Sequence, residues 1–127
     1  MKIAISSAGK NLDSEIDLRF GRCQYFIFVD PETMEFEACE NEGLMASGGA
    51  GVQAAQFIVQ KGAKALITGN LGPNAASALS ASGIKVHLVS GGTIREVTEA
   101  FKAGKLQEAS GATVPPHFGM GRGRGQR

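Results

Sequence analysis

The stretch that decides the fold is GGAGVQAAQFIVQKGAKALITGNLGPNA, Gly48–Ala75. Apolar residues recur at helical spacing from Gly49 onward, and Gly62 is a suitable place for that helix to end. The short apolar run Ala65–Thr68 predicts a buried strand, and Pro73 suits the first turn of a second helix. A helix, a strand and a further helix joined by short turns indicate a parallel sheet covered by helices.

The flanking segments supply the rest of a mixed sheet. Apolar patterns before this stretch predict three strands, two of which form a hairpin around the turn Pro31–Thr33. After it we expect one more strand and a third helix, which begins at the capping box of Thr93 and Glu96. The predicted strands are 2–6, 25–30, 34–39, 65–68 and 85–89, and the predicted helices are 49–62, 73–83 and 93–104. The fold class is therefore α/β, with the order βββαβαβα and a mixed five-stranded sheet flanked by helices.

Length and composition fit one globular domain. The chain has 127 residues, of which 43% are hydrophobic and 20% charged, with a net charge of +1. That balance gives little general attraction to nucleic acid or to a membrane surface. No apolar run approaches the roughly 20 residues of a membrane helix, and the start of the chain lacks the pattern of a signal peptide. We expect a cytoplasmic protein without a disulfide scaffold.

The predicted topology brings distant loops to one edge of the sheet. Loops 6–10, 41–51, 68–73 and 90–93 should all leave that edge, and segment 19–23 should enter the sheet there. Each helix would begin at this edge, where its unpaired N–H groups favour an anion. The alternative is that each glycine cluster only makes a tight turn. The candidate ligand-binding residues are Ser6, Lys10, Arg19, Arg22, Cys23, Ser47, Gly48, Gly49, Gly51, Gly69, Asn70, Gly72, Gly91 and Gly92.

A dinucleotide is a poor candidate for that anion. The segment from Gly49 to Ala54 matches G-x-G-x-x-A, but a dinucleotide site also needs an acidic residue about 20 positions later. Asn70 stands there instead, and the Gly-Lys-Ser/Thr of a P-loop is missing. We therefore expect neither NAD nor ATP. The chain also lacks paired carboxylates on an inner strand and the common catalytic motifs, so we do not expect an enzyme.

Arg19, Arg22 and Cys23 are the candidate side chains for holding an anion. Arginine stays charged and offers planar donors to oxyanions or sulfide-rich anions. Nearby positive charge and helix N-termini would lower the pKa of the Cys23 thiol and favour the metal-binding thiolate. The alternative is a surface arginine pair beside a half-buried cysteine. Cys39 lies on a neighbouring strand and is interpreted as a bystander.

The C-terminal segment 111–127 is rich in glycine and arginine, and its composition predicts a flexible tail. If this tail folds over the sheet edge, His117 could be a further metal ligand. An RNA-binding role through its Arg-Gly repeats is the alternative, but two repeats are few for that function.

Three segments together resemble the dinitrogenase iron–molybdenum cofactor biosynthesis family. They are DLRFGRCQYFIFVD, the stretch Gly48–Ala75 quoted above, and GIKVHLVSGG. The likeness covers residues 1–110. The family includes nitrogenase accessory proteins X and Y and the C-terminal part of cofactor-assembly protein B, and RFGRC is most similar to its molybdenum–copper orange-protein branch.

The resemblance implies a ribonuclease H-like fold. It also implies that the chain binds or carries an anionic molybdenum–iron or molybdenum–copper sulfide cluster, exchanging it with donor and acceptor proteins rather than turning over a substrate. Nucleases of that fold hold metals with carboxylates, whereas KIAIS, GVQAAQFIVQ and ALIT contain none. Some relatives carry a candidate histidine ligand at the position of Arg19 or near Ser47. This chain has Arg19 and Ser47 at those positions, so the resemblance favours electrostatic capture of the cluster together with Cys23 over ligation by histidine. A phosphorylated small metabolite bound at the same edge is the alternative ligand.

Overall fold

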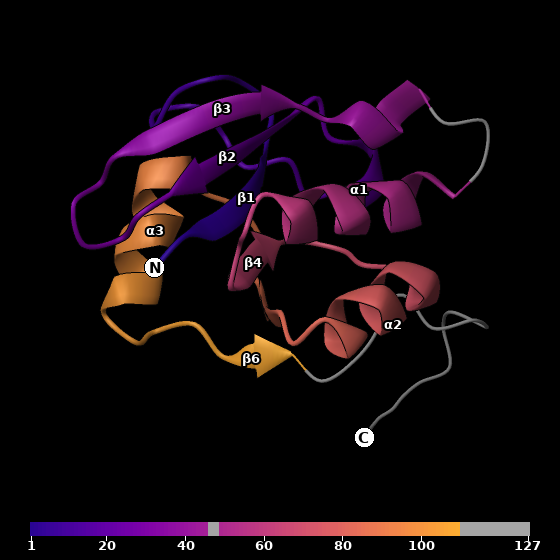
Figure 1. Cartoon of the computed structure of the whole chain (residues 1–127). Helices are drawn as coiled ribbons and strands as arrows, with labels where there is room; N and C mark the ends of the chain where they lie inside the picture. The colour runs from indigo at the N-terminus through magenta and orange to yellow at the C-terminus, as the bar shows by residue number, and fades with distance from the viewer. Residues whose placement is uncertain (46–48, 110–127) are drawn as a thin grey trace.

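The computed structural model describes residues 1–45 and 49–109, and within them it forms a six-stranded sheet flanked by three α-helices (Figure 1). The strands are β1 Ile3–Ser7, β2 Tyr25–Val29, β3 Phe36–Glu40, β4 Ala65–Thr68, β5 Lys85–Leu88 and β6 Glu108–Ala109. The helices are α1 Ala50–Gln60, α2 Pro73–Ala81 and α3 Ile94–Lys102, with short 3-10 helices at Phe20–Arg22 and Glu42–Met45.

The sheet has the order β3-β2-β1-β4-β5-β6. β2 runs antiparallel to both β1 and β3, whereas β1, β4 and β5 are parallel, so the predicted mixed sheet and its element order are confirmed. The predicted count of five strands is wrong, because β6 pairs antiparallel with β5. Two residues are too few to show a period in the sequence, and only the pairing with β5 identifies them as a strand.

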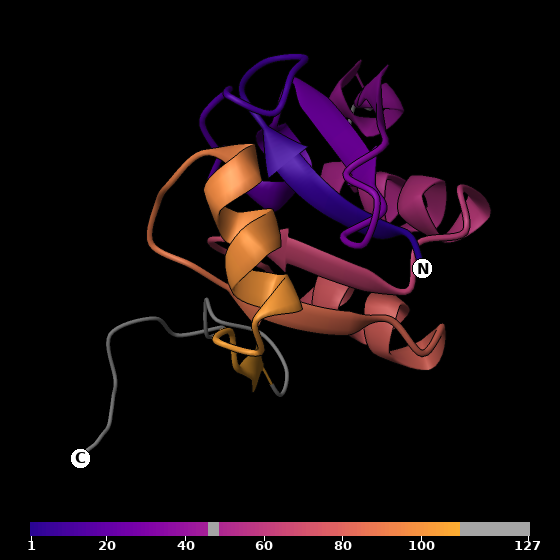
Figure 2. The same ribbon diagram turned by 90° about the vertical axis from the view of Figure 1, so that its left-hand side faces the viewer.

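Helices cover both faces of the sheet. α1 and α2 lie on one face and α3 on the other, as the two views show (Figures 1 and 2). Phe26 and Leu66 belong to the core under α1 and α2, while their neighbours Ile27 and Ile67 belong to the core under α3. The central strands are therefore buried on both sides, which explains why β1 and β4 are buried at every position.

The parallel arrangement sends the helix starts to one edge of the sheet. α1, α2 and α3 have Gly49, Gly72 and Thr93 as their N-cap residues, close to the predicted starts. The predicted tail 111–127 lies outside the described residues. Within the described part of the chain, no helix is both long and apolar enough to cross a membrane.

Candidate functional site

A hollow of about 230 Å³ lies where the starts of α1 and α2 meet the 3-10 helix that precedes β2. We call it the glycine hollow. Its volume is below the roughly 300–1,000 Å³ typical of drug-sized ligand sites, so it suits a small ligand. Within residues 1–45 and 49–109 none of the lining residues is charged, and they are Phe20, Gly21, Gly49, Gly51, Val52, Asn70, Gly72, Pro73, Asn74 and Ala75.

Two helix N-termini open on the glycine hollow without a side-chain cap. Gly49 begins α1 in the left-handed conformation, with φ 67°, and Gly72 begins α2 in an extended conformation. Neither glycine has a side chain that could accept a hydrogen bond from the first turn of its helix. The N–H groups of a first helical turn have no partner inside the helix, and together with the helix dipole they favour an anion.

Close backbone packing explains two of the glycines around the glycine hollow. A Cβ added to Gly21 would lie 3.0 Å from both the Cα and the N of Gly51, and one added to Gly51 would lie 3.3 Å from the Cβ of Ala75. The 3-10 helix, α1 and α2 therefore approach one another through these small residues. A larger side chain at Gly21 would push the first turn of α1 away.

The third helix does not contribute to this site, so the expected meeting of three helix starts is reduced to two. The capping box of Thr93 and Glu96 is present, with Thr93 N–H donating to Glu96 Oε1 and Glu96 N–H to Thr93 Oγ1. The next two N–H groups of α3 donate to the carbonyls of Ser14 and Leu12. Gly91 and Gly92 are not among the lining residues, and their positive φ values of 157° and 118° suit a glycine turn.

Four other residues expected at the site do not line the glycine hollow: Ser6, Lys10, Arg22 and Gly69. Ser6 is fully buried, and its Oγ lies 2.8 Å from Thr68 Oγ1 and donates to the Asp17 carbonyl. Lys10 is exposed with its Nζ 5.5 Å from the centre of the Tyr25 ring, and Arg22 is also exposed. Gly69 packs against Leu18, because an added Cβ would lie 2.5 Å from the Cβ of that residue.

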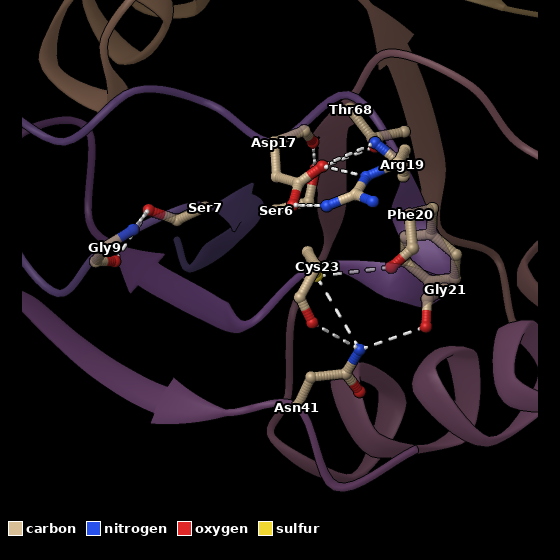
Figure 3. A network of polar contacts seen from close by, with 10 residues as sticks. All are labelled: Ser6, Ser7, Gly9, Asp17, Arg19, Phe20, Gly21, Cys23, Asn41 and Thr68. Atoms are coloured by element: carbon tan, nitrogen blue, oxygen red, sulfur yellow. Dashed lines mark hydrogen bonds and ion pairs between the residues drawn. The ribbon is translucent and has the colours of Figure 1, made fainter. Parts of the chain in front are cut away.

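Arg19 is held by an ion pair at the sheet edge (Figure 3). Its Nε and Nη2 each donate to a different carboxylate oxygen of Asp17 at 3.1 Å. The Arg19 side chain is 69% exposed and the Asp17 side chain only 11%. Burial raises the pKa of Asp17, but the hydrogen bonds and charge of Arg19 outweigh it and leave that pKa below its ordinary value. The positive charge expected here is therefore largely balanced by Asp17.

This ion pair predicts an acid-dependent loss of stability. Because the folded state lowers the pKa of Asp17, its contribution should be complete at neutral pH and lost as the pH falls below about 4. Between neutral pH and the acid range below about pH 4, the unfolding free energy of Asp17→Asn should fall less than that of the wild type. The difference should be up to about 1 kcal/mol, a size typical of exposed ion pairs. Urea unfolding between about pH 2 and 7 measures it. In Arg19→Gln the charge and the guanidinium hydrogen bonds are lost, while burial and the hydrogen bond from the backbone N–H of residue 19 to Asp17 Oδ1 remain, so the slope should weaken. An unchanged slope in both variants contradicts the assignment.

Cys23 is not the reactive thiolate that its neighbours in sequence suggested. The side chain is fully buried, and its Sγ donates to the Phe20 carbonyl at 3.2 Å. Burial, with a smaller effect of the Asp17 charge, raises the pKa of the Cys23 thiol to about 12. The expected lowering of this pKa is therefore wrong, because desolvation outweighs nearby positive charge. A neutral, hydrogen-bonded thiol is a poor metal ligand, and we leave Cys23 out of the ligand set.

The burial of Cys23 predicts selective alkylation. Cys39 is half-buried on β3, so iodoacetamide at pH 8 should modify it at least about 100-fold faster than Cys23, whose thiolate fraction at that pH is on the order of 10⁻⁴. Peptide mapping by mass spectrometry gives the two rates, and both thiols should react alike in urea. Rapid labelling of Cys23 in the folded protein would show that the thiol opens to solvent.

Ser47, Gly48 and His117 lie outside the described residues, so their proposed roles stay predictions. Within residues 1–45 and 49–109, no group of three or more His, Cys, Asp or Glu side chains could hold a metal ion. Of the predicted residues, the structure brings four together at the glycine hollow: Gly49, Gly51, Asn70 and Gly72.

Sequence reasoning missed the other six lining residues. Phe20 and Gly21 stand between Arg19 and Arg22 but were not among the candidate residues. Pro73 was interpreted only as the start of a helix. A helix that starts there also places Asn74 and Ala75, in its first turn, at the sheet edge where the glycine hollow lies. The predicted helix starts could therefore have identified the lining residues of α2, whereas the position of Phe20 at the hollow depends on tertiary packing.

Comparison with known proteins agrees with the sequence and the fold. The family described as "Dinitrogenase iron-molybdenum cofactor" matches residues 1–104. A Methanocaldococcus jannaschii protein titled "uncharacterized" is 33% identical over 85% of this chain and 91% of its own length.

Solved structures show the same likeness. The apo form of the orange protein from Desulfovibrio gigas matches with a TM-score of 0.84 and 40% identity, over 88% of this chain and 95% of that one. A putative NifB protein from Thermotoga matches with a TM-score of 0.73 and 41% identity, over 84% and 91% of the two chains. The chain belongs to the dinitrogenase iron–molybdenum cofactor family.

Proposed function

We propose that the glycine hollow binds an anionic metal–sulfur cluster or its precursor, and that the chain carries this cargo during metallocofactor assembly. Membership of a family named after the iron–molybdenum cofactor supports the class of cargo. The match to the apo orange protein and to a putative NifB protein supports it further. The observation that carries the proposal is the meeting of two uncapped helix starts at one hollow.

The lining favours a sulfide-rich anion over a strongly hydrated one. Backbone N–H groups and the side chains of Asn70 and Asn74 offer hydrogen bonds, while Phe20 and Val52 offer apolar contact. A large, polarisable sulfide anion loses little hydration on entering such a site. A phosphate group loses more, and the described part of the lining has no lysine or arginine to compensate.

The proposed role is binding without turnover. Among the lining side chains that the structure describes, the glycine hollow contains no acid, base or nucleophile. Transfer to and from donor and acceptor proteins would follow from the open position of the hollow at the sheet edge. The ribonuclease H-like assignment, a cytoplasmic location and a lack of nucleic-acid binding stay predictions of the same proposal.

Anaerobic reconstitution tests this function. Purified protein is mixed with tetrathiomolybdate alone, with tetrathiomolybdate and copper(I), or with an iron–sulfide mixture, and desalted. Visible absorption and metal analysis should show about one cluster retained per chain in at least one of these mixtures. Loss of all metal on desalting in every case would contradict the proposal.

A phosphorylated metabolite is the second candidate, because helix N-termini commonly bind phosphate. A thermal-shift screen with nucleotides, sugar phosphates and inorganic phosphate separates the two. We expect stabilisation by the metal–sulfur anion and none by these phosphates at similar concentration. Stabilisation of several degrees by one phosphate, with no response to thiomolybdate, would favour the second candidate.

A further inference from the structure

Asn41 joins two separate backbone segments through one buried side chain. The residue is only 4% exposed. Its Nδ2 donates to the carbonyls of Gly21, at 3.3 Å, and Cys23, at 3.0 Å, and its Oδ1 accepts the N–H of Gly43 at 3.0 Å. Figure 3 shows the amide pointing at the Gly21 carbonyl and at Cys23, whose Sγ is 3.7 Å away. The side chain therefore ties the segment before β2 to the segment after β3.

Both glycines held by Asn41 lie against the first turns of α1. Gly21 is in backbone contact with Gly51, as described above. A Cβ added to Gly43 would lie 2.9 Å from both the carbonyl oxygen of Ala50 and the N of Ala54. The start of α1 thus lies against two backbone segments, and the side chain of Asn41 links these segments to each other.

We propose that Asn41 is a positioning residue for the glycine hollow, although it does not line the hollow itself. By holding Gly21 and Gly43, its amide sets where the first turn of α1 lies relative to the start of α2. The ligand-binding part of this inference rests on the proposed function, whereas the positioning of α1 does not. A buried amide is well suited to satisfy three backbone groups, because its NH₂ group has two donors for carbonyls and its oxygen accepts an N–H.

The test compares Asn41→Asp with Thr98→Val. The first variant keeps the shape of the side chain and its acceptor for Gly43, but it places carboxylate oxygens against the carbonyls of Gly21 and Cys23. The second removes a fully buried hydroxyl that donates to the Ile94 carbonyl in α3, on the other face of the sheet. Both variants should unfold more easily than the wild type.

Amide hydrogen exchange separates positioning from general destabilisation. Gln53 N–H and Ala76 N–H donate to the N-cap carbonyls of α1 and α2, at 2.9 and 3.0 Å. Asn41→Asp should raise exchange at Gln53 at least tenfold more than at Ala76, whereas Thr98→Val should change the two alike. Equal changes in Asn41→Asp would overturn the proposal.

Binding of tetrathiomolybdate tests the functional part. Asn41→Asp should bind it at least tenfold more weakly than the wild type at a temperature where both are folded, and Thr98→Val should bind within about twofold. Wild-type affinity in Asn41→Asp would overturn the proposed link to the hollow. If the wild type does not bind tetrathiomolybdate, the same comparison is made with whichever reconstitution mixture it does retain. If it retains none of the three, the proposed function fails, and the exchange measurement still decides the positioning of α1. Asn41→Ser, which can still accept the Gly43 N–H, replaces Asn41→Asp if that variant does not fold.

Discussion

Gly72→Asp is expected to weaken binding of an anionic cluster about 100-fold or more while leaving the fold at least as stable. Gly72 is the N-cap residue of α2 with φ −75°, a conformation open to any residue, and an added Cβ would meet no atom within 4 Å. An aspartate there would accept hydrogen bonds from the first turn of α2, a favourable cap worth a few tenths of a kcal/mol over glycine. Its negative charge would stand where the ligand binds.

The size of this effect follows from charge repulsion. Two like charges about 4 Å apart near a protein surface repel by roughly 4 kcal/mol, so a loss of affinity of about 100-fold or more, equal to about 2.7 kcal/mol, is expected. Spectroscopic titration with tetrathiomolybdate measures the affinity, and calorimetry measures the stability. The two quantities should change in opposite directions, which a general defect in folding could not produce.

Gly72→Asn is the matched control, because asparagine has the same shape and is also a good N-cap residue. It should retain most of the binding, since it adds no charge. If both variants bind as the wild type does, the ligand is not at the start of α2. If both lose binding equally, the side chain obstructs the hollow and the argument from anion charge fails.

The local signals of the sequence predicted the fold closely. The capping box of Thr93 and Glu96, Pro73 in the first turn of α2, and Gly62 with φ 85° after α1 mark helix ends through interactions within a few residues. The strand order follows from these elements because right-handed crossovers leave few arrangements. β6 was missed because its two residues carry no pattern of their own.

The chemistry of the site was less predictable, because it depends on burial and on which side chains pair. Arg19 and Cys23 stand together in the sequence as a cation beside a thiol. In the structure Asp17 neutralises Arg19, and complete burial keeps Cys23 protonated. Neither result could be seen from residue types, since burial and pairing are set by the packing of the segment 17–23 against β1 and the start of α1.

The glycines illustrate the same limit. Gly69 and Gly72 stand three residues apart in one loop, and sequence reasoning gave both the same role as N–H donors near a helix start. Gly72 faces open space at the glycine hollow, whereas Gly69 is pressed against Leu18. Close approach of a backbone and exposure to a ligand both select glycine, so the residue type alone does not separate them.

Gly69→Ala is therefore expected to lower the free energy of unfolding by about 1–3 kcal/mol, the usual cost of overpacking a well-packed site. The new Cβ would lie 2.5 Å from the Cβ and 2.8 Å from the Cα of Leu18. The two segments cannot separate easily, because Asn70 N–H donates to the Leu18 carbonyl at 2.7 Å. Gly72→Ala is the matched control in the same loop, and its stability should stay within about 0.5 kcal/mol of the wild type. Urea unfolding of both variants measures the difference, and equal stabilities would show that the contact between Gly69 and Leu18 is not tight in solution.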